Sequence, residues 1–456
     1  MRTAGYHPSV RILRRIGIAV AAVLSLLLVA VFGVYLWQAP ILLTGTGYAA
    51  HNACAVTHVA GRDDPASDLP DNPLVPILDV RTDDDVTTAT ILGFAAGQQA
   101  RFTDGFGCTL ASADLSLGEA SQIDGSANPF TNAPAPAADA DLDAAIARAF
   151  GDELSAEGAK EALGTRGVVI VKDGEIVGER YADGFDASTP QLGWSMSKSV
   201  ASLLTGVLVK EGVVALDDDH LRPEWTDGRA DITVEDLLRM QAGIEWDETY
   251  DLGTPITRML YLEGDMGSYV ASLPAAHEPG TFQQYSSGST NLLCSVLVER
   301  TGLGADLPRQ KILGPLGLSS AVFEPDAAGT PVCSSYLWAT PRDWAAVGQF
   351  ALQNGEWNGE QLLPEDWMAT SLEVTPVETT DDPGYGMGWR VNEMLDGSLR
   401  WPELPADTFY ASGHDGQKVI VVPSEGLVVV RMGFTPAVDD APSEVQLVAE
   451  AIAALG

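Results

Sequence analysis

The sequence predicts an α+β fold in which one antiparallel sheet is built from segments at both ends of a domain, while helices fill the middle. Near the start of this domain, an Asp-Gly turn joins the β-branched runs 167–171 and 176–181, which is a strong hairpin signal. Near the C-terminus, the apolar runs 419–423 and 427–432 predict a second antiparallel pair. We therefore expect one sheet assembled from segments that are distant in the chain.

Helical patterns lie between these hairpins and just before the first one. Residues 141–150 have helical spacing, 200–208 is an almost uninterrupted apolar run, and 290–298 is a second one. Thr233, followed three residues later by Asp236, is typical of a capped helix start. The expected architecture is an antiparallel sheet flanked by helices, with a mostly helical subdomain.

The composition is that of a globular protein with a strongly acidic surface. Hydrophobic residues make up 46% of the 456 residues and charged residues 20%, so two or three folded units are expected. The chain has 63 acidic and 26 basic residues, a formal net charge of −37. This charge repels phosphate backbones, so nucleic acid is not an expected partner.

Residues 16–37 form an uncharged stretch that is long enough to span a membrane. Basic residues precede it, whereas the first one after it is Arg62, so a cytoplasmic N-terminus is predicted. The preceding basic residues are Arg2, Arg11, Arg14 and Arg15. A cleaved signal peptide is the alternative, but its apolar region is usually only about 7–15 residues long. We expect a retained single-pass anchor in the cell membrane, with the rest of the chain outside.

The chain divides into five expected regions. They are a cytoplasmic N-terminus (1–15), a transmembrane anchor (16–37), a small extracytoplasmic accessory module (38–123), a linker rich in Pro, Ala, Asn and Asp (124–140), and the α+β domain (141–456).

The four cysteines are not spaced as a metal site. Export permits disulfides, and Cys54 and Cys108 bracket the accessory module, so a bridge between them is possible. Cys294 lies inside an apolar run, so we expect it to be a buried free thiol.

Ser195 and Lys198 are the first candidate catalytic residues. A serine hydroxyl is a weak nucleophile unless a base takes its proton and donors stabilise the resulting oxyanion. If a helix begins at Ser195, Lys198 lies one turn on and its amine reaches the hydroxyl, while the Ser195 N–H can serve an oxyanion. The alternative is a capping serine with an exposed lysine. The apolar run that follows argues against it, and no other lysine has a serine three residues before it.

Tyr285 and Ser287 form the second candidate element, just ahead of an apolar helix. A tyrosine beside a lysine can share the general-base role and return the proton to the leaving group. Ser287 is expected to hydrogen-bond Lys198. The alternative is a tyrosine that only packs at a loop edge.

The third element is the segment His414-Asp415-Gly416-Gln417, just before a predicted strand. Glycine lets a substrate backbone approach closely, and the Gln417 N–H is a candidate second oxyanion donor. His414 and Gly416 are expected to contact the substrate, although a lone histidine here is more often exposed.

Other hydrolase chemistries lack their sequence patterns. The segment around Ser195 does not complete Gly-x-Ser-x-Gly, and no His-Glu-x-x-His occurs, so neither a metal nor another cofactor is expected.

The three motifs, in this order, resemble those of the serine β-lactamase and penicillin-binding-protein superfamily. The resemblance is greatest to class C β-lactamase-like hydrolases, which include esterases, D-amino-peptide hydrolases and 6-aminohexanoate-dimer hydrolases. It extends from about residue 141 to 456 and includes the segments 168–181, 232–243, 278–280 and 384–389.

This resemblance implies an acyl-enzyme on Ser195, with Lys198 and Tyr285 as general base, acting on a small ester, amide or peptide. Tyr250 resembles a substrate-contacting rim residue of the 6-aminohexanoate-dimer hydrolases. Ser287 and His414 stand where true β-lactamases usually have asparagine and lysine, which favours ester or amide hydrolysis over that of β-lactams. The alternatives are a D-amino-peptide hydrolase, a β-lactamase, or a non-catalytic member that binds peptidoglycan or a partner.

Overall fold

The computed structural model describes the chain except for residues 1–7, 70–73, 111–115, 155–162, 378 and 436–441. Arg2, one of the basic residues on which the predicted orientation depends, lies outside the described residues. The helices are α1 (Pro8–His58), α2 (Ala140–Ala149), α4 (Met196–Lys210), α5 (Val234–Leu238), α6 (Pro255–Leu262), α7 (Met266–Ser272), α8 (Ser287–Thr301), α9 (Gly314–Leu316), α10 (Pro341–Leu352), α11 (Trp367–Leu372) and α12 (Pro442–Leu455).

The strands fall into one large sheet and several small ones. The large sheet contains β5 (Thr165–Lys172), β6 (Glu175–Tyr181), β14 (Arg390–Val391), β15 (Phe409–Gly413), β16 (Gln417–Val422) and β17 (Leu427–Gly433). A four-stranded sheet contains β1 (Leu78–Asp83), β2 (Val86–Ile91), β3 (Ala95–Thr103) and β4 (Gly107–Leu110). The short strands are β7 (Gln191–Leu192), β8 (Phe282–Gln283), β9 (Val322–Phe323), β10 (Leu337–Ala339), β11 (Glu356–Trp357), β12 (Glu360–Gln361) and β13 (Thr379–Thr380).

The large sheet has the strand order β14-β15-β16-β17-β5-β6, and all its pairs are antiparallel. The first hairpin of the domain therefore pairs with the last strand, β17, as expected for a sheet built from distant segments. Its turn has Asp173 and Gly174 at positive φ, 50° and 84°, which is the geometry that an Asp-Gly turn favours between twisted strands. The expected fold class is confirmed.

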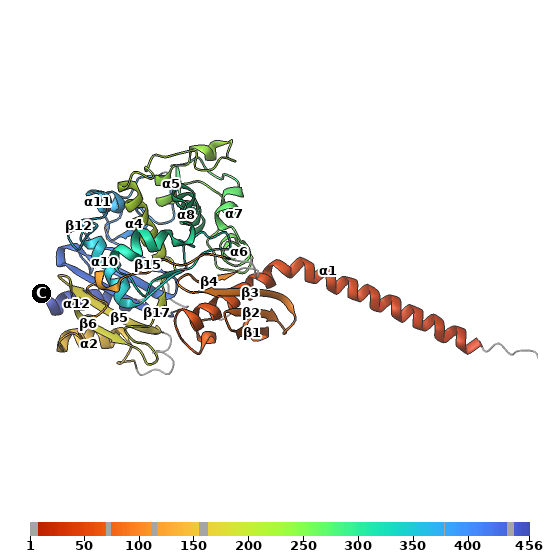
Figure 1. Cartoon of the computed structure of the whole chain (residues 1–456). Helices are drawn as coiled ribbons and strands as arrows, with labels where there is room; N and C mark the ends of the chain where they lie inside the picture. Colours follow the sequence, from red (N-terminus) through yellow and green to blue (C-terminus); the bar gives the residue numbers. More distant parts are fainter. Residues whose placement is uncertain (1–7, 70–73, 111–115, 155–162, 378, 436–441) are drawn as a thin grey trace, which may run out of the picture.

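Alternating side chains of this sheet pack into two apolar layers. On one face, Val168 and Ile170 pack with α2 and α12, and on the other, Val169 and Val171 join the main core with α4 and α10 (Figure 1). Helix α4 is buried from Met196 to Leu208, as its apolar sequence predicts. This burial fixes α4 against β15 and β16, next to the β14 edge of the sheet.

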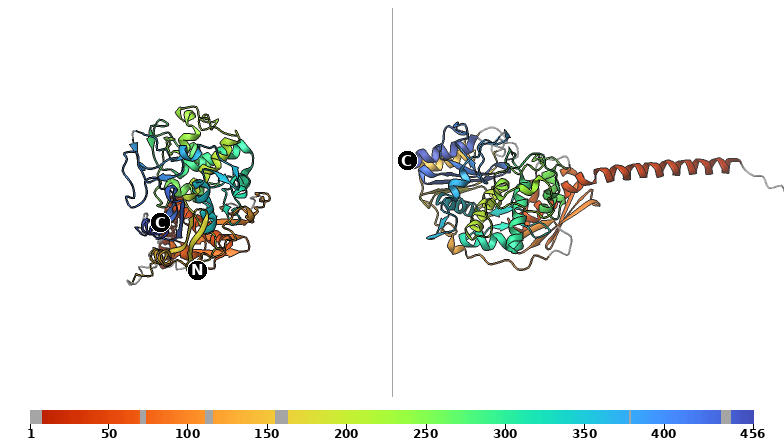
Figure 2. Two further views of the ribbon diagram at one scale, coloured as in Figure 1. Left: turned by 90° about the vertical axis from the view of Figure 1, so that its left-hand side faces the viewer. Right: turned by 90° about the horizontal axis from the view of Figure 1, so that it is seen from above.

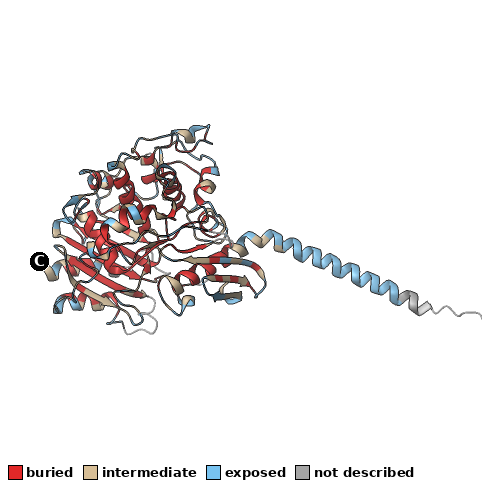
Figure 3. Cartoon of the chain, in the orientation of Figure 1, coloured by how far each residue is buried: buried red, intermediate tan, exposed pale blue. Residues whose placement is uncertain are grey.

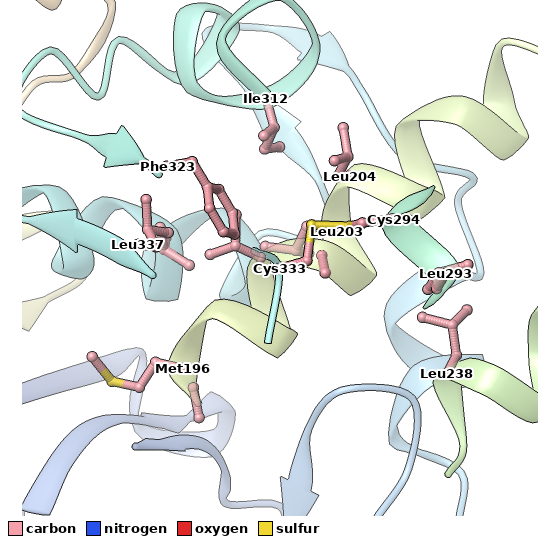
Figure 4. Packing of buried hydrophobic residues seen from close by; sticks show 14 of the residues in the cluster. Met196, Leu203, Leu204, Leu238, Leu293, Cys294, Ile312, Phe323, Cys333 and Leu337 are labelled. Atoms are coloured by element: carbon pink, nitrogen blue, oxygen red, sulfur yellow. A yellow bond between two sulfur atoms is a disulfide. The ribbon is translucent and has the colours of Figure 1, made fainter. Parts of the chain in front are cut away.

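The expectation of a free thiol at Cys294 is wrong, because Cys294 forms a disulfide with Cys333 (Figure 4). The two cysteines are 39 residues apart, and only the tertiary fold brings the loop that carries Cys333 against α8. The apolar sequence around Cys294 correctly indicates burial but carries no information about this partner.

Helix α1 runs without a break from Pro8 to His58, past Pro40 and beyond the expected end of the anchor. Its N-terminal part is exposed, whereas the part from Thr44 onward packs against β2, β3 and β4 (Figure 3). A disulfide between Cys54 and Cys108 joins the helix to β4. Among the described residues, this helix alone is long and apolar enough to cross a membrane, and a signal sequence near an N-terminus has the same properties.

The four-stranded sheet lies against the α+β domain (Figure 2), and Ala89 and Ala100 of the sheet share an apolar cluster with Trp338 of the domain. The Glu324 carboxylate accepts a hydrogen bond from the backbone N–H of Cys108 at 2.7 Å and lies 3.0 Å from His51. The segment expected as a linker packs along the domain: Phe130 is buried in the main core, and the Asn128 amide donates to Asp343 at 2.7 Å.

Candidate active site

Ser195 stands at the N-cap position of α4, directly after a strained residue. Trp194 has φ +47°, in the left-handed region that bulky residues rarely adopt, at a cost of about 1–3 kcal/mol. The sharp turn is held by the Gly193 N–H, which donates to the carbonyl of Leu337 at 2.9 Å. Ser195 consequently lies where the helix begins and faces a pocket.

Lys198 lies one turn further along α4 and is only 2% exposed. Its Nζ is 2.9 Å from Ser195 Oγ, 3.0 Å from Ser287 Oγ and 3.0 Å from the carbonyl oxygen of Ser334. The sequence correctly places the amine beside the Ser195 hydroxyl and beside Ser287.

These contacts fix two of the hydrogens on Nζ. Ser287 donates its own hydrogen to Glu248 at 2.5 Å, so its oxygen accepts from Lys198. The carbonyl of Ser334 can only accept. The remaining direction on Nζ points at Ser195 Oγ, where a free amine presents the lone pair that takes a proton.

Glu248 is a site residue that the sequence motifs do not reveal. Its carboxylate accepts hydrogen bonds from Trp246 Nε1 at 2.5 Å, from the Ser287 N–H at 2.9 Å and from the Ser287 hydroxyl. It therefore lies at the N-terminus of α8, where the helix dipole stabilises a negative charge. Glu248 comes from an irregular loop, and no periodicity or motif spacing predicts its position.

Tyr285 lies between two cations. Nζ of Lys198 is 4.7 Å from the centroid of its ring, and the guanidinium carbon of Arg390 is also 4.7 Å from it. The Tyr285 N–H donates to the Asp381 carboxylate at 3.1 Å, which holds the segment before α8 in place. Both cations lie over the ring, so cation–π contacts hold the Tyr285 side chain at the pocket.

Arg390 is the second residue that sequence reasoning missed. It lies on the two-residue strand β14 at the sheet edge, and Asp382 binds both its guanidinium and that of Arg400. Burial opposes its charge, but Tyr285 and Asp382 raise the pKa of Arg390, so it stays cationic. A two-residue strand gives no pattern from which this position follows.

The pocket in front of Ser195 has a volume of about 630 Å³. It combines titratable groups with a few apolar and aromatic side chains, as ligand sites commonly do. Its lining residues are Ser195, Glu248, Tyr250, Tyr285, Asp381, Asp382, Pro383, Arg390, Met394, Leu399, Arg400, Tyr410, Ser412, Gly413 and His414.

Tyr250 and His414 form one wall of this pocket. Their rings stack 4.8 Å apart with an interplanar angle of 9°, and Trp194 meets both edge-on. Burial, and next the charge of Glu248, raises the pKa of Tyr250 well above its ordinary value, so its phenol keeps its hydrogen. The Tyr250 hydroxyl has no hydrogen-bond partner among the described residues, which leaves a donor for a ligand.

The third motif is divided by a tight turn. Gly413 packs against the Gly193 backbone, where a side chain would collide with its carbonyl oxygen, so β15 runs beside the nucleophile. The turn at Asp415 and Gly416, with φ of 60° and 84°, then directs the chain away. Neither Gly416 nor Gln417 lines the pocket, and the Gln417 amide instead binds the backbone of Gly433. The structure thus brings His414 to Ser195 but not Gln417.

Comparison with known proteins agrees with this arrangement. A family model described as Beta-lactamase matches residues 145–451. The 6-aminohexanoate-dimer hydrolase of Paenarthrobacter ureafaciens is 25% identical over 237 residues, which cover 48% of this chain and 60% of that enzyme. The D-aminopeptidase of Brucella canis is 28% identical over 190 residues, which cover 38% of this chain and 36% of that protein. The chain therefore spans less than two thirds of either relative.

Two solved structures share the fold. A family VIII carboxylesterase has a TM-score of 0.54 at 17% identity, covering 71% of this chain and 99% of its own. A novel penicillin-binding protein homolog from Caulobacter crescentus has a TM-score of 0.54 at 20% identity, with the same coverage of 71% and 99%. The related proteins named as hydrolases agree with the enzyme class expected from the motifs. Since the family model matches more than half of its residues, the chain belongs to the beta-lactamase family.

Proposed function

We propose that this chain is a serine hydrolase that forms an acyl-enzyme on Ser195 and hydrolyses a carboxylic ester or amide. The observation that carries the proposal is the 2.9 Å contact between Lys198 Nζ and Ser195 Oγ, inside a network that leaves one direction on Nζ open to the hydroxyl. The network matches a general base beside a nucleophile. The names of the related hydrolases agree with it.

In the proposed reaction, Lys198 takes the proton of Ser195 as the oxygen attacks the substrate carbonyl. Tyr285, flanked by Lys198 and Arg390, shares this role and returns the proton to the leaving oxygen or nitrogen. Water then hydrolyses the acyl-enzyme by the same proton transfers in reverse.

We assign the oxyanion contacts to the N–H groups of Ser195 and His414. Ser195 is at the start of α4, where backbone donors face the pocket, and His414 directly follows Gly413 at the pocket wall. This assignment replaces Gln417, which lies outside the pocket lining. The Tyr250 phenol is the proposed donor to a polar group of the substrate.

Labelling of the full-length protein with a fluorophosphonate probe tests the nucleophile. The parent protein and a Ser197→Ala variant should be labelled, while a Ser195→Ala variant should not. Ser197 is a matched control, because it is two residues away and its hydroxyl accepts from the Leu337 N–H instead. If the folded parent protein stays unlabelled, the chain is a binding module of this fold and not a hydrolase.

Turnover assays then separate the substrate classes. We expect short-chain p-nitrophenyl esters to be hydrolysed, D-alanyl peptides to be slower, and nitrocefin to be a poor substrate. Ser287 and His414 occupy the positions at which β-lactamases carry asparagine and lysine, so a cationic contact for a β-lactam carboxylate is lacking there. Efficient nitrocefin turnover would contradict this ranking.

We also propose that residues 16–37 remain as a membrane anchor and that the domain lies outside the cytoplasm. The uncharged exposed part of α1 and the two disulfides support this placement, because disulfides persist in oxidising compartments. Carbonate extraction of membranes, with mass spectrometry of the N-terminus, tests it. A soluble product that begins after Trp37 would identify a cleaved signal sequence instead.

A further inference from the structure

The turn between β2 and β3 exposes two large apolar side chains. Phe94 is 81% exposed and Leu92 is 63% exposed. Among the described residues, Phe94 is the most exposed large hydrophobic side chain. It is more exposed than any hydrophobic side chain in the exposed part of α1. Ile77 lies beside this turn, since its carbonyl accepts from the Leu92 N–H at 2.9 Å, and it is itself exposed. Exposed apolar patches of this kind mark surfaces for a partner or a membrane.

The backbone holds these side chains outward. Leu92 and Ala96 have φ of 52° and 47°, and Gly93 between them has φ of 80°. A bulky residue such as leucine rarely adopts positive φ. The hydrogen bonds of the turn, including Phe94 N–H to Ile91 carbonyl at 3.2 Å, maintain this conformation.

The turn lies next to the end of the proposed membrane span. The Ala96 N–H donates to the Tyr35 hydroxyl at 3.3 Å, and the Ala96 carbonyl accepts from Thr46 at 2.7 Å. Tyr35 belongs to the last turn of the uncharged stretch 16–37. Figure 1 shows β2 and β3 running toward the side from which the exposed part of α1 leaves the globular region, and Figure 2 agrees.

The charge distribution of this sheet matches that direction. No charged residue occurs between Val86 and Ala100, in a chain in which 20% of the residues are charged. The opposite end of β2, which is antiparallel to β1, carries the acidic turn Asp83-Asp84-Asp85. The β2–β3 hairpin is therefore uncharged where it approaches the span and acidic at its far end, while Asp79 of the neighbouring β1, which lies beside Gly93, is paired with Arg81. Trp37 is 76% exposed, and with Phe94 and Tyr35 it supplies the aromatic residues that membrane–water interfaces favour.

We propose that the β2–β3 turn, through Leu92 and Phe94, inserts into the interfacial region of a zwitterionic phospholipid bilayer beside α1. A single helix leaves a domain free to tilt and rotate on the membrane, and this second contact fixes its orientation. The insertion is shallow, of the order of 5–10 Å, as is typical of interfacial apolar residues. The proposal rests on the proposed anchor, and the experiment below separates the two.

Spin-label accessibility of the full-length protein in phosphatidylcholine nanodiscs tests the insertion. The four cysteines form two disulfides, so an introduced cysteine is the only free thiol. A nitroxide is attached to one introduced cysteine at a time. Phe94→Cys reports on the β2–β3 turn, and Asp84→Cys reports on the acidic turn at the far end of the same sheet, as the matched control. Leu27→Cys reports on the middle of the span. Collisions with oxygen, which concentrates in lipid, are compared with collisions with a water-soluble nickel chelate.

We expect the ratio of oxygen to nickel collisions to be highest at Leu27, intermediate at Phe94 and lowest at Asp84. If the ratio of oxygen to nickel collisions at Phe94 equals that at Asp84 while Leu27 lies in lipid, the turn does not insert, but the membrane anchor is still supported. A water-exposed Leu27 would overturn both. Low collision with both reagents at Phe94 would show burial in a protein contact and would also overturn the lipid assignment.

A second variant tests the role of the apolar side chains themselves. With the label at Ile77→Cys, replacing Leu92 and Phe94 together by aspartate should raise nickel accessibility, because charged residues at the turn cannot enter lipid. The Leu27 label should be unaffected in the same background. Unchanged nickel accessibility at Ile77 would contradict the proposal.

Discussion

The Ser287 hydroxyl lies 3.0 Å from Lys198 Nζ and donates its own hydrogen to Glu248 at 2.5 Å. The half-buried Glu248 carboxylate is thus connected to the lysine through one side chain. Its hydrogen bonds hold Ser287 so that the serine oxygen accepts from Lys198.

Replacing Glu248 with glutamine tests this connection. We expect kcat for a p-nitrophenyl ester to fall roughly 10- to 100-fold with little change in KM, since the network that positions Lys198 is disturbed. Glu235→Gln is the control, because the Glu235 carboxylate accepts from Arg239 and does not line the pocket. An equal loss of kcat in the Glu248 and Glu235 variants would contradict a specific role for Glu248 in positioning Lys198.

Replacing Arg390 with methionine should lower kcat for ester hydrolysis roughly 10-fold or more. The guanidinium carbon lies 4.7 Å from the centroid of the Tyr285 ring, so its loss removes a cation–π contact that holds this side chain in place. Arg390→Lys keeps a cation at this position and should restore part of the activity, measured as ester turnover. Arg400→Met is the matched control, since Arg400 shares Asp382. Equal losses of activity in the Arg390→Met and Arg400→Met variants would show that both arginines act only by binding Asp382.

Local signals predict most of the fold and the centre of the site. The Asp-Gly hairpin, the apolar run of α4 and the Ser195–Lys198 spacing are each encoded within a few residues, so the sequence reveals them. The positions of Glu248 and Arg390 depend on an irregular loop and a two-residue strand, which have no periodicity. Asp415 has a positive φ, and the turn at this residue directs Gln417 away from the pocket. Because the sequence does not reveal this turn, it does not predict the position of Gln417.

The disulfide between Cys294 and Cys333 should affect both stability and catalysis. Ser287, Asn291 and Cys294 are spaced four and three residues apart on α8, so they share one face. Asn291 accepts the N–H of Ser334, whose carbonyl binds Lys198, and Cys333 is the residue before it. The disulfide thus tethers the segment that positions the base.

We therefore expect alanine at Cys294 and Cys333 to destabilise the protein by about 4 kcal/mol, from the chain entropy of a 39-residue loop, and to lower kcat. Thermal melting and ester turnover measure the two effects. Alanine at Cys54 and Cys108 is the control, because this pair closes a loop of similar length, 54 residues, away from the pocket. Equal loss of kcat in both double variants would contradict a tethering role.

The stability of the domain should also respond to the titration of Asp326. Burial raises the pKa of this carboxyl to about 6, although it accepts the N–H groups of Met266, Ala328 and Thr330. The folded state then binds more protons than the unfolded state between about pH 4 and pH 6, so the contribution of Asp326 to stability falls as pH rises through this window. Asp326→Asn does not titrate. The difference in melting temperature, parent minus variant, should be larger at pH 4 than at pH 7. A constant or increasing difference would show that the three N–H donors outweigh burial and keep the carboxylate charged.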